Sequence, residues 1–222
     1  MSVRVKICGI RDEAALEAAM AAGADFIGLV FFPPSPRNVS MEQAARLAAM
    51  ARGRVKTVAL VVDADDELLT AIAREARPDY LQLHGGETPR RVDEISKIVE
   101  IPLIKAFRVR DEGDIRAAKD YSPHIAFPLF DAWVSEEDSG GLPGGSGHSF
   151  DWRLLKEHSS PFMLAGGLTP RNVAAAIGAT GAPMVDVSSG VESSRGVKDA
   201  GKIRAFIEAA KGAGSSRRSL SP

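Results

Sequence analysis

The feature that most constrains the fold of this chain is a regular alternation of short apolar segments with alanine-rich helical segments. Eight short segments are β-branched or aliphatic and mostly apolar throughout, which is typical of strands buried on both faces. They cover residues 3–8, 26–30, 55–62, 80–83, 103–107, 125–130, 162–164 and 184–187. Eight further segments predict helices, at residues 12–22, 41–52, 65–77, 88–99, 111–119, 152–158, 170–177 and 198–211. Strict alternation of strand and helix predicts a parallel sheet with right-handed crossovers.

Chain length favours closure of that sheet. Eight units in 222 residues leave about 28 residues for each strand, its helix and two short loops. An open doubly wound sheet is possible, but eight full repeats favour an α/β (βα)8 TIM barrel with eight parallel strands in a single domain. We expect this domain to span residues 1–212 and the Gly- and Ser-rich residues 213–222 to form a disordered tail.

Two helix starts carry recognisable capping residues. Ser40 is followed three residues later by Gln43, the spacing of a capping box. Thr169 precedes Pro170, which predicts a capping residue followed by proline in the first turn.

Composition narrows the functional class. With 28 Lys+Arg against 29 Asp+Glu, the chain has no general electrostatic reason to bind nucleic acid or acidic membranes. No apolar run approaches the ~20 residues of a transmembrane helix, and no apolar signal-peptide core opens the chain. The single cysteine, Cys8, excludes an intrachain disulfide and a Cys-rich zinc site. We therefore expect a cytoplasmic protein, with no nucleic-acid or membrane partner, that is a monomer.

Two groups at predicted strand ends suit acid–base chemistry, because reacting groups of such barrels lie at the C-terminal ends of strands. Cys8 ends the first strand and Asp131 follows the sixth. A lone cysteine is more often a small buried hydrophobe, and Asp131 could simply bind loop amides. A thiolate whose pKa is lowered by a cation such as Arg37, or by amides, could instead act as nucleophile or base, while a desolvated carboxyl would be a general acid. A proton acceptor and a proton donor around one phosphorylated substrate favour an isomerase over a hydrolase.

Glycine-rich loops follow the last two predicted strands. Gly166 and Gly167 follow the seventh strand, and Ser189 and Gly190 follow the eighth. Each loop alone is compatible with an ordinary turn, but the pair occupies the usual phosphate site of this architecture.

Two further side chains are weaker candidates. Arg37 offers a charged fork suited to a carboxylate, although a surface arginine is the commoner interpretation. His84 could orient a substrate or bind the next loop, and both interpretations stay open. The sequence predicts neither a metal site nor a cofactor.

Several motifs occur together and in order: KICGI (6–10), SPR (35–37), LQLHGGE (81–87), FDA (130–132), GGSGHSFDW (144–152), LAGGLTPRNV (164–173) and DVSSGVESSRGVKD (186–199). Over residues 3–210 the chain resembles the phosphoribosylanthranilate isomerase family of tryptophan biosynthesis. The resemblance implies a (βα)8 barrel that converts N-(5-phosphoribosyl)anthranilate to 1-(2-carboxyphenylamino)-1-deoxyribulose 5-phosphate without a cofactor.

The resemblance also implies a role for each matching position. Cys8 matches the catalytic base and Asp131 the general acid. The remaining matches contact the small-molecule phosphoribosyl substrate: Arg37 at the anthranilate carboxylate, His84 near the substrate, Asp186 lining the mouth, and Gly166, Gly167, Ser189 and Gly190 at the phosphate. The chain departs from many relatives at Arg11, where they carry threonine, and in residues 133–143, which are longer than usual. We expect this segment, residues 133–143, to form a mobile lid over the substrate.

Two other functions remain open from the sequence. A related isomerase of histidine biosynthesis would act on a phosphoribosyl carboxamide, but that reaction usually relies on two aspartates, whereas the first strand here ends in Cys8. A non-catalytic phosphosugar sensor would not require both Cys8 and Asp131. A thiol-redox role is weaker, because the chain has no resolving cysteine.

Overall fold

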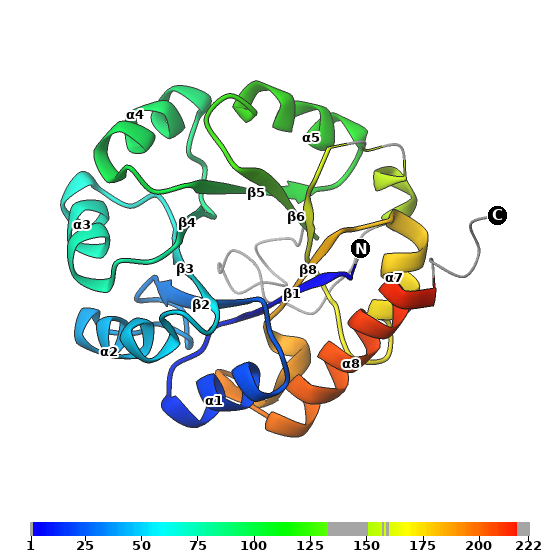
Figure 1. Ribbon diagram of the computed structural model, residues 1–222. Coiled ribbons are helices and arrows are strands. Elements are labelled where there is room, and N and C mark those ends of the chain that lie inside the picture. Colours follow the sequence, from blue (N-terminus) through cyan, green and yellow to red (C-terminus); the bar gives the residue numbers. More distant parts are fainter. Residues whose placement is uncertain (1, 133–150, 157, 159, 217–222) are drawn as a thin grey trace.

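Eight parallel strands close into a barrel in chain order, β1-β2-β3-β4-β5-β6-β7-β8, in a computed structural model that describes residues 2–132, 151–156, 158 and 160–216. The strands are β1 (Arg4–Cys8), β2 (Phe26–Phe31), β3 (Lys56–Val61), β4 (Tyr80–Leu83), β5 (Leu103–Val109), β6 (Phe127–Ala132), β7 (Met163–Leu164) and β8 (Met184–Val187). Figure 1 shows the helices forming a ring outside the strands. The predicted barrel is confirmed.

The surrounding helices are α1 (Glu13–Ala21), α2 (Met41–Ala51), α3 (Asp66–Ala71), α4 (Pro89–Val99), α5 (Glu112–Ala117), α7 (Val173–Thr180) and α8 (Ala200–Ser216). A π-helical turn, Ile72–Ala76, continues α3, and a 3₁₀ turn, Ala118–Tyr121, continues α5. Within the described residues, no helix is both long and apolar enough to cross a membrane.

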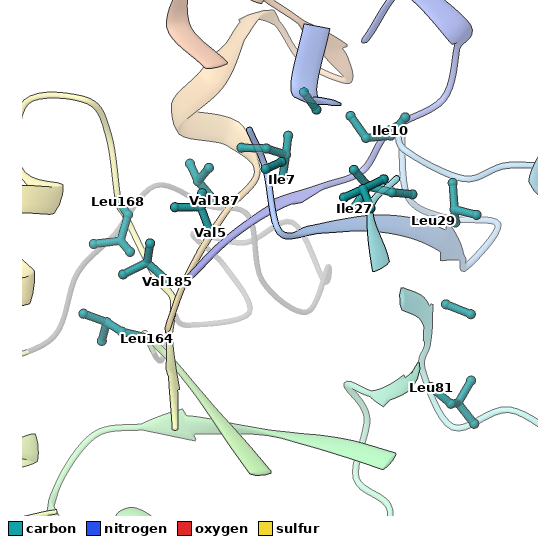
Figure 2. Packing of buried hydrophobic residues seen from close by; sticks show 14 of the residues in the cluster. Val5, Ile7, Ile10, Ile27, Leu29, Leu81, Leu164, Leu168, Val185 and Val187 are labelled. Carbon is teal, nitrogen blue, oxygen red and sulfur yellow. The ribbon is translucent and has the colours of Figure 1, made fainter. Parts of the chain in front are cut away.

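Side chains along each strand point alternately toward the helices and into the barrel, which divides the core into two layers. Side chains such as Val5, Ile7 and Val185 belong to the large apolar cluster between the strands and the helices, which Figure 2 shows from close by. A second cluster, including Phe26, Leu129 and Met184, fills the barrel interior. Because successive side chains of a strand point to opposite faces, a residue two positions after one of these interior residues also points inward.

The predicted helix at residues 152–158 is wrong. The structure has a four-residue 3₁₀ helix there, Trp152–Leu155. The segment is only seven residues long before Ser159, Ser160 and Pro161, too short to offset the entropy of helix nucleation without strong packing.

The end of the barrel domain also differs from expectation. Helix α8 runs through Ser216, so the assignment of residues 213–216 to a disordered tail is wrong. Once a helix has formed, each added residue gains a hydrogen bond without a new nucleation cost, which lets the helix extend into Gly- and Ser-rich sequence. Residues 217–222 lie outside the described residues, as do residues 133–150, which include the whole segment 133–143 expected to form a lid.

The two predicted helix caps have different outcomes. Ser40 and Gln43 form the capping box of α2, with the Gln43 amide donating to Ser40 Oγ at 3.1 Å. The predicted start at Thr169 and Pro170 is wrong, because α7 begins at Val173. The preceding residues form a turn in which the Thr169 amide donates to Asn172 Oδ1 at 2.7 Å.

A small hairpin precedes α8 and was not expected. Strands β9 (Glu192–Ser194) and β10 (Val197–Lys198) pair antiparallel. Gly196 in the connecting turn has φ +83°, and a Cβ there would lie 2.8 Å from the carbonyl oxygen of Pro36. The hairpin therefore packs on the loop after β2, which brings residues from both segments to one place.

Candidate active site

Cys8 lies inside the barrel above a buried ion pair. Lys6, two residues earlier on β1, is fully buried, and its Nζ donates to Asp186 Oδ1 of β8 at 3.1 Å. Cys8 itself is 5% exposed. Gly28 of β2 pairs with Cys8 in the sheet register, and a Cβ there would lie 2.8 Å from Cys8 Sγ and 3.2 Å from Lys6 Nζ. The absence of a side chain at Gly28 thus makes the space in which the thiol and the ammonium lie.

Burial raises the pKa of the Cys8 thiol above its ordinary value, and the Lys6 ammonium opposes this rise. Burial alone would lower the pKa of Lys6, but Asp186 and Cys8 raise it above its ordinary value. Burial also raises the pKa of the Asp186 carboxyl, again against Lys6. The expectation that Arg37 tunes the thiol is not supported, because the cations that lower the pKa of Cys8 are Lys6 and Lys198.

Asp131 lies in β6, two residues after the interior residue Leu129, and points toward the same space. Its Oδ1 accepts a hydrogen bond from the Ala132 amide at 2.9 Å, and its Oδ2 is 3.4 Å from His84 Nε2. His84 Nδ1 lies 2.8 Å from Nε2 of the fully buried Gln82. The charge of Asp131 adds to the rise in the Asp186 pKa and His84 opposes it. Cys8, Lys6, Asp186, His84 and Asp131 therefore form one electrostatic cluster.

Arg37 is held at the rim of the mouth by a carboxylate of the hairpin. Its Nε and Nη2 donate to the two carboxylate oxygens of Glu192, at 2.7 and 3.0 Å. Lys198 Nζ donates to Glu192 Oε1 at 2.9 Å and to the carbonyl of Ser188 at 2.9 Å. Burial would raise the pKa of Glu192, but the hydrogen bonds from Arg37 and Lys198 lower it below its ordinary value. Glu192 thus holds the guanidinium of Arg37 in place through Nε and Nη2, and Nη1 makes no hydrogen bond to Glu192.

The two glycine-rich loops pack against each other and against β6. Gly166 and Gly167 have φ +87° and +61°, and a Cβ on Gly166 would lie 3.0 Å from Asp131 Oδ1. A Cβ on Gly190 would collide with the carbonyl oxygen of Leu168. Glycine is therefore needed at these positions partly because the backbones pack too closely to leave room for a side chain. The amides of Gly166 and Gly167 have no acceptor in the described part of the chain, which leaves them available to an anion.

The ranges that the structure describes contain no group of three or more His, Cys, Asp or Glu side chains arranged to hold a metal ion. The polar groups of the mouth are instead a thiol, three carboxyls, an imidazole, a guanidinium, two lysines and backbone amides. This set can donate and accept protons and can bind anions.

A family model described as N-(5′-phosphoribosyl)anthranilate (PRA) isomerase matches residues 5–209. The chain belongs to this family. The resemblance seen in the sequence motifs is confirmed, and the match covers every strand of the barrel except the first residue of β1.

Individual relatives agree with the family assignment. The N-(5′-phosphoribosyl)anthranilate isomerase of Paramagnetospirillum magneticum is 51% identical over 214 residues, covering 96% of this chain and 99% of that protein. A solved PRA isomerase in complex with reduced 1-(o-carboxyphenylamino)-1-deoxyribulose 5-phosphate has a TM-score of 0.81 and 34% identity, covering 95% of this chain and 99% of that one. A structure of mutually generated monomers of the dimeric Thermotoga maritima isomerase has a TM-score of 0.80, 34% identity and the same coverage.

Sequence reasoning missed four residues of the site: Lys6, Gln82, Glu192 and Lys198. Each had a signal. Lys6 is a charged residue between the apolar Val5 and Ile7, two positions before Cys8. Gln82 is a polar residue between Leu81 and Leu83, two positions before His84. Glu192 and Lys198 lie within the DVSSGVESSRGVKD motif. Their connection to Arg37 depends on the hairpin, which strand and helix periodicity does not predict.

Proposed function

We propose that this chain isomerises N-(5′-phosphoribosyl)anthranilate with Cys8 as the base and Asp131 as the general acid. The isomerisation, a step of tryptophan biosynthesis, follows from membership of the family. The observation that supports the two roles is their placement on β1 and β6, on different sides of the barrel ring, with both side chains in one cluster inside the mouth. A substrate between them would meet a proton donor and a proton acceptor.

The chemistry assigned to these groups conserves protons and electrons. Asp131 donates its proton to the ribose ring oxygen, and the C1′–O bond breaks to give an open-chain Schiff base. The Cys8 thiolate then takes the proton from C2′. The released electron pair forms the C1′–C2′ double bond of an enolamine, which tautomerises to the aminoketone. Each such acid or base typically contributes ~10²–10⁴-fold to the rate.

Binding would use the two ends of the substrate. We assign the phosphate to the backbone of Gly166, Gly167, Ser189 and Gly190. The left-handed Gly166 and Gly167 have amides without an acceptor among the described residues, which suits a close approach by an anion, and Gly190 packs against the same loop at Leu168. We assign the anthranilate carboxylate to Arg37, whose guanidinium is held in place by Glu192. His84 and Asp186 would line the space between these ends, and no cofactor enters the scheme.

The decisive experiment for the activity follows the fluorescence of PRA after addition of the purified protein. A decrease that depends on protein concentration is expected. Parallel incubation with a phosphoribosyl carboxamide substrate of the histidine-type reaction should give no turnover. Turnover of the carboxamide alone, or tight binding of PRA without turnover, would contradict the proposed function.

We also propose that the protein is a cytoplasmic monomer. Among the described residues, Val197 is the one large hydrophobic side chain that is exposed, at 50%. A stable interface normally buries an apolar core, and this surface offers little material for one. Light scattering coupled to size exclusion should give a mass near 23.6 kDa; twice that mass, as in the dimeric relative, would contradict the monomer.

A further inference from the structure

Cys8, the base of the proposed mechanism, needs a nearby positive charge that the site residues predicted from the sequence do not supply. A thiol removes a proton from carbon only as the thiolate. Cys8 is almost fully buried, and burial disfavours the thiolate. Arg37, the cation suggested by the sequence, is engaged by both carboxylate oxygens of Glu192. A different cation must therefore stabilise the thiolate.

Lys6 is placed to be that cation. It is on the same strand as Cys8, two residues earlier, so both side chains point into the barrel. Both reach the space left by Gly28: a Cβ there would lie 2.8 Å from the thiol sulfur and 3.2 Å from the ammonium nitrogen. The ammonium donates to a single carboxylate oxygen, Asp186 Oδ1 at 3.1 Å. An ammonium has three donors, so this hydrogen bond leaves others for the sulfur.

The groups that face Cys8 come from three elements. The charged ones are Lys6 on the same strand as Cys8, Asp186 on β8 and Lys198 on β10, whereas β2 contains no charged residue. Among these charges Lys6 has the largest effect on the thiol, Asp186 opposes it, and Lys198 has a smaller effect in the direction of Lys6. Lys198 is itself engaged by Glu192 and by Ser188.

We propose that Lys6 is a positioning residue for the reaction, with its ammonium, anchored by Asp186, acting as the counter-charge of the Cys8 thiolate. This inference rests on the proposed role of Cys8 as the base. Asp186 keeps the buried ammonium charged and fixed in place between substrate turnovers. When the thiolate takes the C2′ proton its charge disappears, and the Lys6–Asp186 pair remains as a neutral unit. A buried ion pair that served stability alone would need no thiol beside it.

The test uses the fact that the chain has one cysteine. Thiolate absorbance near 240 nm is followed against pH in the intact protein, and the same titration of Cys8→Ser is subtracted to remove the tyrosine signal. Lys6→Met keeps the length of the side chain and removes its charge. We expect the midpoint of the thiol titration to rise by about one pH unit or more, the effect of losing a close opposite charge.

Two further variants make the result interpretable. Lys6→Met leaves Asp186 buried without a counter-charge, so the double variant Lys6→Met/Asp186→Asn removes both charges should the single variant fail to fold. Its midpoint should lie between those of the wild type and Lys6→Met, because the effect of Lys6 on the thiol exceeds that of Asp186. Lys105→Met is the matched control: Lys105 is also buried and pairs with a carboxylate, Glu87 at 2.9 Å, but no effect of it on Cys8 is seen. Its midpoint should equal that of the wild type.

The pH dependence of kcat/KM distinguishes a positioning role of Lys6 from a purely structural one. At neutral pH, Lys6→Met should lose about tenfold in kcat/KM for each pH unit by which the thiol midpoint rises, and it should recover as the pH is raised through that midpoint. An unmoved midpoint in both Lys6 variants, or a moved midpoint without a matching change in the pH–rate profile, would overturn the proposal. Absence of wild-type turnover would refute the proposed function instead, while the titration would still decide the coupling between Lys6 and Cys8.

Discussion

Substituting Gly28 by alanine should damage the site from within the barrel. The new Cβ would lie 2.8 Å from Cys8 Sγ, 3.1 Å from Cys8 Cα and 3.2 Å from Lys6 Nζ. Ordinary contacts begin near 3.4 Å, so the thiol and the ammonium must both move by several tenths of an ångström. Overpacking of this kind costs about 1–3 kcal/mol. Alanine in a strand recovers about 0.5–1 kcal/mol relative to glycine, so a net loss of about 1–2 kcal/mol in the free energy of unfolding is expected.

The same displacement should slow the reaction. A misplacement of 1 Å can cost about 10²-fold in rate, so a smaller shift of the base should reduce kcat/KM roughly tenfold. Urea unfolding measures the first effect and the PRA fluorescence assay the second. Gly178→Ala is the matched control, because a Cβ there meets no atom of the described residues within 4 Å. It should raise stability by about 0.5–1 kcal/mol and leave turnover unchanged. Wild-type stability and turnover in Gly28→Ala would refute the steric argument.

Two further predictions concern the rim of the mouth. Arg37→Ala should mainly raise KM for PRA, through loss of the carboxylate fork, and Arg37→Lys should restore little of it because lysine cannot bind in bidentate fashion; an unchanged KM in steady-state assays would remove Arg37 from substrate binding. Glu192 has a lowered pKa in the folded protein, so its ionised form adds stability above its unfolded pKa that is lost as pH falls through the folded value. Urea unfolding should therefore show Glu192→Gln less stable than the wild type at pH 7, with the difference shrinking below about pH 4.5, the usual range of a glutamate; a difference that grew toward acid pH would contradict this sign.

The fold was predictable because its strongest signals are local. Apolar strands that alternate with helices leave few architectures, and the bounds of β4 and β8 were predicted to the residue. The errors occur where the local sequence pattern and the tertiary packing favour different structures. The helix expected at 152–158 is a 3₁₀ turn, and α8 extends into the expected tail, as far as Ser216. The cost of helix nucleation explains the short 3₁₀ turn, and the ease of helix propagation explains the length of α8. Residue type alone predicts neither.

The site was predictable only in part, for a different reason. Strand ends indicate Cys8 and Asp131 as candidates, because the reacting groups of such barrels lie at the C-terminal ends of the strands. The partners of these groups depend on contacts between residues far apart in the sequence. Lys6 meets Asp186 across 180 positions, and Arg37 meets Glu192 across 155. From the sequence, Arg37 was one cation that could lower the pKa of the thiol, whereas the structure pairs it with Glu192, a carboxylate of the hairpin.

The central claim is that Cys8 and Asp131 exchange protons with the substrate. Its most direct test is the kcat of Cys8→Ala and of Asp131→Asn in the PRA fluorescence assay, with circular dichroism confirming that each variant is folded. Each substitution should lower kcat by at least ~10²-fold, because each removes a proton-transfer group that acts in the transition state. Turnover near the wild-type value in a folded variant would contradict the role assigned to that residue.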